Sequence, residues 1–208
     1  MAITTPQNRL YLASKSPRRR DLLKQIGVNF EVLLLREFPI ARQDIDETPL
    51  PAEISDQYVL RVATQKAEIG AQRVQERRLR AMPVLAADTS VVLDGAVIGK
   101  PGDSSDAATI LRRLSGNKHQ VHSAVAVAQW GHTFTAVSVT EVRFRDLTDE
   151  EIRRYIASGE PMDKAGAYAI QGRAAAFIAG ISGSYSGVMG LPLFETAELL
   201  KKINFPLP

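Results

Sequence analysis

Two long runs of alternating polar and apolar residues, 120–128 and 133–144, flank the dipeptide Trp130-Gly131. Alternation with a period of two is typical of β-strands that bury one face. The short interval between the runs predicts that they pair as a long antiparallel hairpin. The fold must therefore contain a sheet that accommodates two unusually long neighbouring strands.

The N-terminal part of the chain predicts a strand, a helix and a strand in succession. Residues 10–13 form a short apolar run, and residues 30–35 form another. The helix predicted between them has both ends marked, with Ser16 as the N-cap, Pro17 at the first helical position and Gly27 as the terminator. Elements in this order are the usual opening of an α/β fold.

The remaining elements are predicted from pattern and capping signals. Residues 83–87 predict a buried strand, and residues 91–93 and 96–98 predict a hairpin across Asp94-Gly95. Residues 36–54 are irregular, acidic and rich in proline, and a loop of this length in a compact domain is typically functional. Four further helices are predicted, from Ser55 to about Val74, from Ser105 to Gly116, from the capping box at Thr148 to Gly159, and from about Pro192 to Lys202. Short strands are predicted within residues 175–190.

These elements together predict a mixed α/β protein. We expect residues 1–208 to form a single domain, because neither an internal repeat nor a linker interrupts the pattern. The sheet should be largely antiparallel, extended and twisted, with flanking helices and two lobes around a central cleft. A chain of 208 residues is long enough to bury a sizeable core.

Composition and charge exclude several classes of protein. The chain has no cysteine, which excludes disulfide scaffolds and zinc sites built on thiolates. Its three histidines are too few for an all-histidine site, so any metal is expected to be held by oxygen. A formal charge of +3 does not indicate a nucleic-acid-binding protein. Because no apolar run is long enough for a membrane span and no secretory signal is evident, we expect a cytoplasmic protein without membrane contact.

The first candidate site is the segment from Ser14 to Arg19, between the first strand and the first helix. Free backbone N–H groups at a helix N-terminus favour an anion, and Lys15, Arg18 and Arg19 add donors suited to phosphate oxygens. Positive side chains at the positive end of the helix dipole are electrostatically unfavourable, and a bound polyanion would compensate for this. The alternative is a capped helix with a solvated basic first turn.

The second candidate is Asp88-Thr89, at the expected C-terminal end of the strand 84–87. Ligands of open α/β sheets collect beyond the carboxyl ends of strands, although an acid there can simply cap a turn. Glu47 in the acidic loop offers a second carboxylate. Together Glu47 and Asp88 are candidates for holding Mg²⁺, which usually takes one or two carboxylates plus substrate phosphates.

A third set of candidates consists of polar residues beside glycine or proline. Lys100 lies between Gly99 and Pro101, and Gln171 lies between Ile170 and Gly172. A lysine with rigid neighbours suits a fixed task, and an amide can recognise the edge of a base through paired donor and acceptor atoms. Taken singly, the patterns favour a simpler interpretation. Lys100, and Lys66 on the helix predicted from Ser55, are typical of solvated surface charges, and Gln171 is typical of a residue that shapes a turn.

Several of these segments, taken in order, resemble one family, the Maf-like (septum formation inhibitor) nucleoside triphosphate pyrophosphatases. They extend over nearly all of residues 10–200, and the ordered set is far more specific than any single member. The matching segments are 12–19, Asp46-Glu47, Lys66-Ala67, 87–89, 99–101, Ser115-Gly116 with His119, 163–168, 170–172 and 190–193.

The resemblance implies hydrolysis of a nucleoside triphosphate to the monophosphate and pyrophosphate by a cytoplasmic, dimeric protein. It also implies a divalent cation, Mg²⁺ or alternatively Mn²⁺ or Co²⁺. The family's proton acceptor falls on Asp88, and its positions linked to substrate choice fall on Arg19, Thr89 and Gln171. These residues are similar to those of the subgroup that acts on dTTP and UTP.

The family resemblance and the residue chemistry suggest the same division of labour. Arg18, Arg19, Lys66 and Lys100 would hold the triphosphate, and Glu47, Asp88 or both would hold the metal. Asp88 would accept the proton of the attacking water directly or act mainly through the metal. Three residues depart from the pattern expected for the family, namely Lys15, Ser123 and Gly187. Two alternatives remain open at this point, a nucleotidyltransferase and a regulator of cell division that binds nucleotide without turnover.

Overall fold

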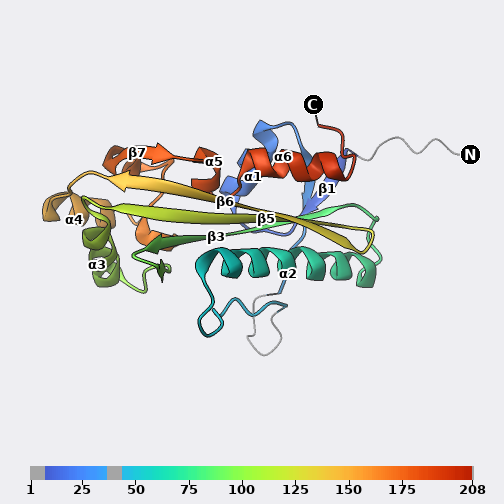
Figure 1. Cartoon of the computed structure of the whole chain (residues 1–208), viewed down its shortest axis with the longest axis horizontal. Helices are drawn as coiled ribbons and strands as arrows, with labels where there is room; N and C mark the ends of the chain where they lie inside the picture. The colour runs from blue at the N-terminus through green and yellow to red at the C-terminus, as the bar shows by residue number, and fades with distance from the viewer. Residues whose placement is uncertain (1–7, 37–43, 208) are drawn as a thin grey trace, which may run out of the picture.

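A computed structural model describes residues 8–36 and 44–207 of the chain as a mixed sheet flanked by helices (Figure 1). The strands lie in the order β2-β1-β3-β5-β6-β7, and β4 pairs with the C-terminal end of β3. The strands are β1 (Arg9–Leu12), β2 (Asn29–Val32), β3 (Val84–Leu93), β4 (Ala96–Ile98), β5 (Lys118–Gln129), β6 (His132–Phe144) and β7 (Ile178–Ser182). The helices are α1 (Pro17–Gln25), α2 (Ser55–Glu76), α3 (Ser104–Leu114), α4 (Asp149–Ala157), α5 (Tyr185–Val188) and α6 (Leu193–Lys202), with 3₁₀ turns η2 (Ala165–Ala167) and η3 (Arg173–Phe177).

The sheet combines parallel and antiparallel pairs as predicted. Strand β1 runs parallel to both β2 and β3, whereas β3, β5, β6 and β7 pair antiparallel. The predicted long hairpin is confirmed, with β5 and β6 in register from Lys118 opposite Arg143 to Gln129 opposite His132. The hairpin across Asp94-Gly95 is confirmed as well, because both residues have the positive φ angles that its tight turn requires.

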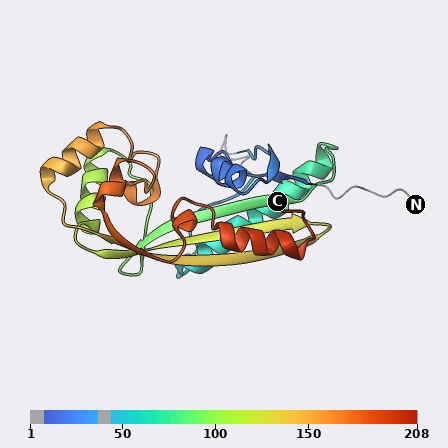
Figure 2. The same ribbon diagram turned by 90° about the horizontal axis from the view of Figure 1, so that it is seen from above.

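Two lobes share the long strands of this sheet. Figure 1 places α3, α4 and β7 at one end and α1, α6 and β1 at the other, and Figure 2 shows the same groups separated along the long axis. We call the end with α1, α2 and α6 the first lobe and the end with α3 and α4 the second lobe. The two lobes have separate apolar cores, so the predicted mixed, two-lobed α/β fold is confirmed.

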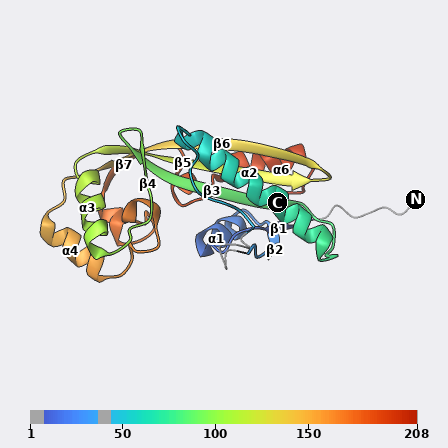
Figure 3. The same ribbon diagram turned by 90° about the horizontal axis from the view of Figure 1, so that it is seen from below.

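In the first lobe, helices cover both faces of the sheet. Leu23 of α1 and Leu199 of α6 pack in the core on one face, whereas Ala63 and Ala67 of α2 pack in the core on the other. Figure 3 shows α2 running along the long strands. Its small residues allow this close approach, since a Cβ atom on Gly70 would lie only 2.8 Å from Cγ1 of Val84.

Strand β3 corrects the expected position of Asp88. The predicted strands 83–87 and 91–93 are one ten-residue strand, so Asp88 lies in its interior rather than at its C-terminal end. The strand continues because Asp88 and Thr89 remain paired with β5, opposite Ala124 and Ser123. Strand β1, however, ends at Leu12 opposite Leu85. Asp88 therefore lies just beyond the carboxyl end of its parallel neighbour.

Helix starts agree with the prediction where the cap is local. Ser16 accepts a hydrogen bond from the backbone N–H of Arg19, and the capping box at Thr148 is complete. Ser55 does not cap α2, because its hydroxyl lies 2.7 Å from that of buried Ser90. The N-cap of α3 is Asp103, so this helix begins before Ser105.

Two further expectations are settled by the described residues. The segment 175–190 contains the strand β7 and the short helix α5 rather than several strands. The expected loop 36–54 has neither helix nor strand where it is described, and residues 37–43 lie outside the described part. No helix within the ranges 8–36 and 44–207 combines the length and apolar character needed to cross a membrane.

Candidate active site

Arg19 in the first turn of α1 joins three segments that are distant in sequence. Its Nε donates to the carbonyl oxygen of Gly190 at 2.7 Å, and its Nη1 and Nη2 donate to the hydroxyls of Ser14 (3.3 Å) and Thr89 (3.4 Å). Burial lowers the pKa of the guanidinium, and the carboxylates of Asp88 and Glu47 oppose that shift. Arg19 is therefore a fixed cation beside the middle of β3.

Thr89 continues this chain of contacts into β5. Its hydroxyl lies 3.0 Å from the hydroxyl of Ser123, which donates to the carbonyl oxygen of Gly187 at 2.7 Å. Ser123 is fully buried, so its hydroxyl requires partners within the protein. Two of the three positions that depart from the family pattern, Ser123 and Gly187, thus contact each other and help to fix Thr89.

Lys66 of α2 joins two carboxylates in the same lobe. Its Nζ lies 2.8 Å from Oδ1 of Asp88 and 2.9 Å from Oε1 of Glu47. The side chains of Lys66 and Asp88 are only 14% and 11% exposed, whereas that of Glu47 is 52% exposed. A carboxylate as buried as Asp88 needs a cationic or hydrogen-bonding partner, and Lys66 provides one.

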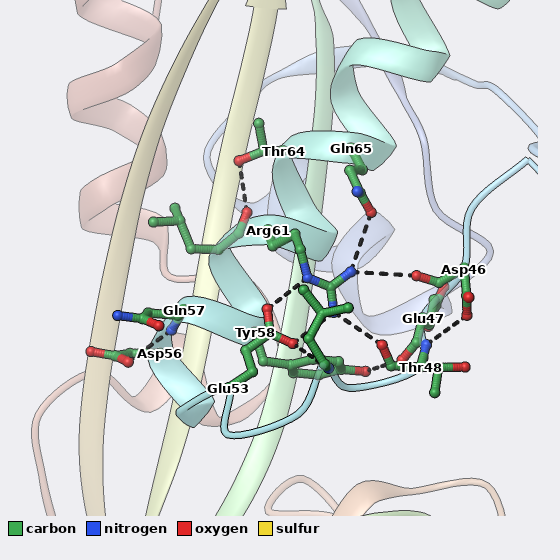
Figure 4. Close-up of polar contacts among 12 residues, drawn as sticks. Asp46, Glu47, Thr48, Glu53, Asp56, Gln57, Tyr58, Arg61, Thr64 and Gln65 are labelled. Atoms are coloured by element: carbon green, nitrogen blue, oxygen red, sulfur yellow. Dashed lines mark hydrogen bonds and ion pairs between the residues drawn. The ribbon is translucent and has the colours of Figure 1, made fainter.

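The loop that carries Glu47 is fixed to α2 by Arg61 (Figure 4). The guanidinium of Arg61 makes two hydrogen bonds to Glu53, at 2.6 and 2.8 Å, and another to the carbonyl oxygen of Thr48 at 3.1 Å. The hydroxyl of Tyr58 donates to the carbonyl oxygen of Glu47 at 3.0 Å. Burial, followed by the charges of Asp88 and Glu47, raises the pKa of Tyr58 to about 12.

Sequence reasoning did not identify Tyr58 or Arg61, although a signal was present. Tyr58, Arg61 and Gln65 recur at helical spacing along α2, and all three are labelled in Figure 4 on the side of the helix that faces the acidic loop. A basic and aromatic stripe on the predicted helix, preceded by four carboxylates in residues 44–53, was therefore visible. The contact itself depends on how the loop folds back.

Lys100 and Gln171 lie in the second lobe, on turns held by backbone hydrogen bonds. The N–H of Gly166 in η2 donates to the carbonyl oxygen of Gly99 at 3.0 Å, which fixes the turn that carries Lys100. Both side chains are exposed, and within the described part of the chain neither has a hydrogen-bonding or ionic partner. The structure does not join them to Arg19 or Asp88.

Arg18 belongs to the first lobe, and its charge acts on a carboxylate of the second lobe, that of Asp163. The pKa of Asp163 is lowered mainly by a hydrogen bond from Lys164, with a smaller electrostatic contribution from Arg18. Of the predicted site residues, the structure thus brings together Arg19 with Thr89, and Lys66 with Asp88 and Glu47. Arg18, Lys100 and Gln171 are placed separately.

Glu47 and Asp88, the predicted metal ligands, supply oxygen atoms of the kind that a divalent cation such as Mg²⁺ prefers. Among the described residues, no three carboxylate or histidine side chains are grouped so that they could hold a metal ion by themselves. Glu47 and Asp88 nevertheless direct oxygen atoms at one cationic centre, the ammonium of Lys66. Two carboxylates suit Mg²⁺ when phosphate oxygens and water complete its coordination. The donor set therefore fits a cation that arrives with a phosphorylated ligand.

Comparisons with known proteins bear on the nature of this site. Residues 9–203 match the model of the family described as Maf-like protein. The chain belongs to the Maf-like protein family. The match confirms the resemblance inferred from the motifs, and it includes every candidate site residue of this Maf-like chain.

Curated relatives of the Maf-like chain resemble it over almost their whole length. A protein of Aromatoleum aromaticum is 57% identical over 97% of this chain and 98% of its own, and one of Nitrosomonas europaea is 57% identical over 96% and 97%. A protein of Dechloromonas aromatica is 56% identical over 95% and 98%. All three bear the name dTTP/UTP pyrophosphatase.

Among solved structures, the Staphylococcus aureus Ham1 protein aligns with 94% of this chain and 97% of its own. The sequence identity is 15% and the TM-score is 0.49.

Proposed function

We propose that this chain hydrolyses dTTP and UTP to the monophosphate and pyrophosphate. The observation that carries the proposal is the 57% identity, over nearly the full chain, to relatives named for this activity. The arrangement around β3 supports it, because fixed cations and carboxylates lie together there. Cations suit the charge of a triphosphate, and a carboxylate can accept a proton from the attacking water.

In the proposed reaction, Arg18, Arg19, Lys66 and Lys100 bind the phosphate oxygens. A water molecule attacks the α-phosphorus, Asp88 accepts its proton, and pyrophosphate leaves. Since the protein forms no covalent bond to the substrate, most of the acceleration comes from positioning and charge stabilisation. Before substrate and metal bind, the contact with Lys66 at 2.8 Å holds the carboxylate of Asp88 in place.

A divalent cation is part of the proposal. Glu47 and Asp88 are the residues that would hold it, with Mg²⁺ as the expected ion and Mn²⁺ or Co²⁺ as alternatives. When bound, the ion would neutralise charge on the phosphate oxygens. Lys66 would then contact the phosphate, since its ammonium and the metal cannot share one position between the two carboxylates.

Recognition of the base is assigned to Thr89 and Gln171, with Arg19 holding Thr89. Thymine and uracil share the same polar atoms on their pairing edge, and an amide can match such a pair of donor and acceptor atoms. Gln171 suits this task because it is exposed and has no partner among the described residues.

The proposal also includes the setting of the enzyme. We expect a homodimer that acts in the cytoplasm on free nucleotides and not on nucleic acid. The small net charge of +3 is compatible with a nucleotide substrate and offers little attraction for a nucleic-acid backbone.

The decisive experiment incubates the protein with dTTP or UTP, a divalent metal and no second substrate, and detects pyrophosphate and orthophosphate separately. Pyrophosphate with an equal amount of monophosphate is expected. Pyrophosphate only in the presence of an acceptor would favour a nucleotidyltransferase. Saturable binding without monophosphate, in Mg²⁺, Mn²⁺ and Co²⁺, would favour a nucleotide-binding regulator of cell division.

A further inference from the structure

The turn that carries Gln171, residues 169–173, is held at both ends by two side chains of the second lobe. The hydroxyl of Tyr155 in α4 accepts a hydrogen bond from the N–H of Ala169 at 3.2 Å and donates one to Oε1 of Glu160 at 2.9 Å. Oε2 of Glu160 accepts from the N–H of Arg173 at 3.1 Å. Tyr155 and Glu160 therefore form a bracket around the turn.

Gly172 shows how closely the carboxylate of this bracket lies against the turn. A Cβ atom at Gly172 would lie 2.1 Å from Oε1 and 2.6 Å from Oε2 of Glu160, far inside the van der Waals distance. A free carboxylate could swing away from such a methyl group. This one is held from both sides, so moving it would break the hydrogen bonds to Tyr155 and Arg173.

The bracket connects the turn to the core of the second lobe. Tyr155 is 3% exposed, and its ring packs edge-on against that of Phe177 with centroids 5.2 Å apart. The carbonyl oxygen of Glu160 accepts a hydrogen bond from Nζ of Lys164 at 2.8 Å. Core packing thus fixes the backbone on each side of Gln171, whose own side chain has no partner in the described structure.

We propose that Glu160 and Tyr155 are specificity-determining positioning residues, which set the orientation of Gln171 and hence the preference for the base. The inference rests on the proposed function in one respect, namely that Gln171 contacts the base. Neither residue of the bracket needs to touch substrate. A loosened turn allows Gln171 to adopt several orientations, so its amide matches thymine or uracil less well while the phosphate contacts persist.

The test compares Glu160→Ala, Glu160→Gln and Tyr155→Phe with the unmodified protein. For dTTP and dGTP, kcat/KM is measured by pyrophosphate release, and Kd is measured without turnover in Ca²⁺. We expect the dTTP preference to fall about tenfold in Glu160→Ala and Tyr155→Phe, mainly through KM for dTTP. Glu160→Gln should lose only about threefold, because its amide oxygen retains one of the two acceptor positions.

Three controls separate positioning from general damage. Glu150→Gln removes an exposed carboxylate from α4, the helix that carries Tyr155, and should leave the preference unchanged. Inhibition by inorganic tripolyphosphate, which has no base, should be unaffected in every variant. Glu160→Ala combined with Gln171→Ala should discriminate no worse than Gln171→Ala alone, since the bracket acts through Gln171.

Gly172→Ala provides an independent variant should the others fold poorly. Its methyl group displaces the Glu160 carboxylate, so it should reproduce the loss of preference seen in Glu160→Ala. An unchanged dTTP preference in folded Glu160→Ala and Gly172→Ala would overturn the inference. A different outcome would separate the two proposals. If neither the unmodified protein nor any variant releases pyrophosphate, but the Kd values still show a base preference that these variants lose, the bracket is supported and only the proposed function is overturned.

Discussion

The two lobes position their candidate residues in different ways. In the first lobe the side chains hold one another, as Arg19 holds Thr89 and as Lys66 joins Asp88 to Glu47. In the second lobe, hydrogen bonds hold the backbone of the turns that carry Lys100 and Gln171. The side chains of both residues are exposed to solvent.

The difference follows from burial. Asp88 and Lys66 are nearly buried, so each charge must have a partner in the folded protein, and those partners fix its orientation before any ligand arrives. Exposed residues on turns have no such need and remain available to a ligand. On the proposed function, the chemistry belongs to the first lobe, and the second lobe adds a phosphate contact through Lys100 and a base contact through Gln171.

The strongest test of this comparison is Asp88→Asn. The amide retains the shape of the side chain but cannot accept a proton from water, so pyrophosphate release should fall at least about 100-fold. Circular dichroism should remain unchanged, because the backbone pairing of Asp88 with β5 is preserved. Near-normal activity in this variant would remove Asp88 from the mechanism.

A direct contrast between the lobes comes from Lys66→Met and Lys100→Met. Loss of Lys66 leaves two carboxylates without their shared cation, so kcat should fall by about tenfold or more and the free energy of unfolding by about 2 kcal/mol. Lys100→Met should raise KM by about tenfold with an unchanged melting temperature. Steady-state kinetics and thermal unfolding of both variants check the contrast, and equal loss of stability would contradict it.

Gln171→Glu tests the second lobe for selectivity. The carboxylate removes the amide donor, so the preference for dTTP and UTP over purine triphosphates should fall about tenfold, with a smaller change in kcat. Competition assays with mixed nucleotides measure the ranking directly. An unaltered ranking would show that Gln171 does not read the base.

The smallest effect on activity is expected from Asp44→Asn, which tests whether a buried ion network in the first lobe serves stability alone. The carboxylate of Asp44 is buried and accepts two N–H bonds from Arg36 and two from Arg73. Burial raises the pKa of Asp44, but the hydrogen bonds from Arg73 and Arg36 outweigh it and lower the pKa from 3.8 to about 2.

Because the folded-state pKa is depressed, the stabilisation is present above pH 3.8 and is lost as the pH falls toward about 2. Asp44→Asn should therefore reduce the free energy of unfolding by about 2 kcal/mol at pH 6, and the difference should shrink toward pH 2. Urea unfolding at both pH values provides the measurement. Turnover at pH 7 should change less than about twofold.

Much of the fold could be predicted because its signals are local. The Ser16 cap, the capping box at Thr148 and the Asp94-Gly95 turn each involve residues at most three positions apart. Alternation of polar and apolar residues was sufficient to predict the pairing of β5 with β6. The continuous strand β3 could not be predicted, because the polar residues Asp88 and Thr89 interrupt its apolar pattern and only pairing with β5 keeps them extended.

The sequence by itself determined which chemical groups this protein carries, where most helices and strands begin, and which family it resembles. Only the tertiary structure decided which of those groups meet. Arg19 and Gly190 are 171 residues apart, Lys66 and Asp88 are 22 apart, and Glu160 reaches the backbone of Arg173 across a turn. Local preferences act over a few residues, whereas such contacts form only when packing of the whole chain compensates for the entropy of closing the loops between them.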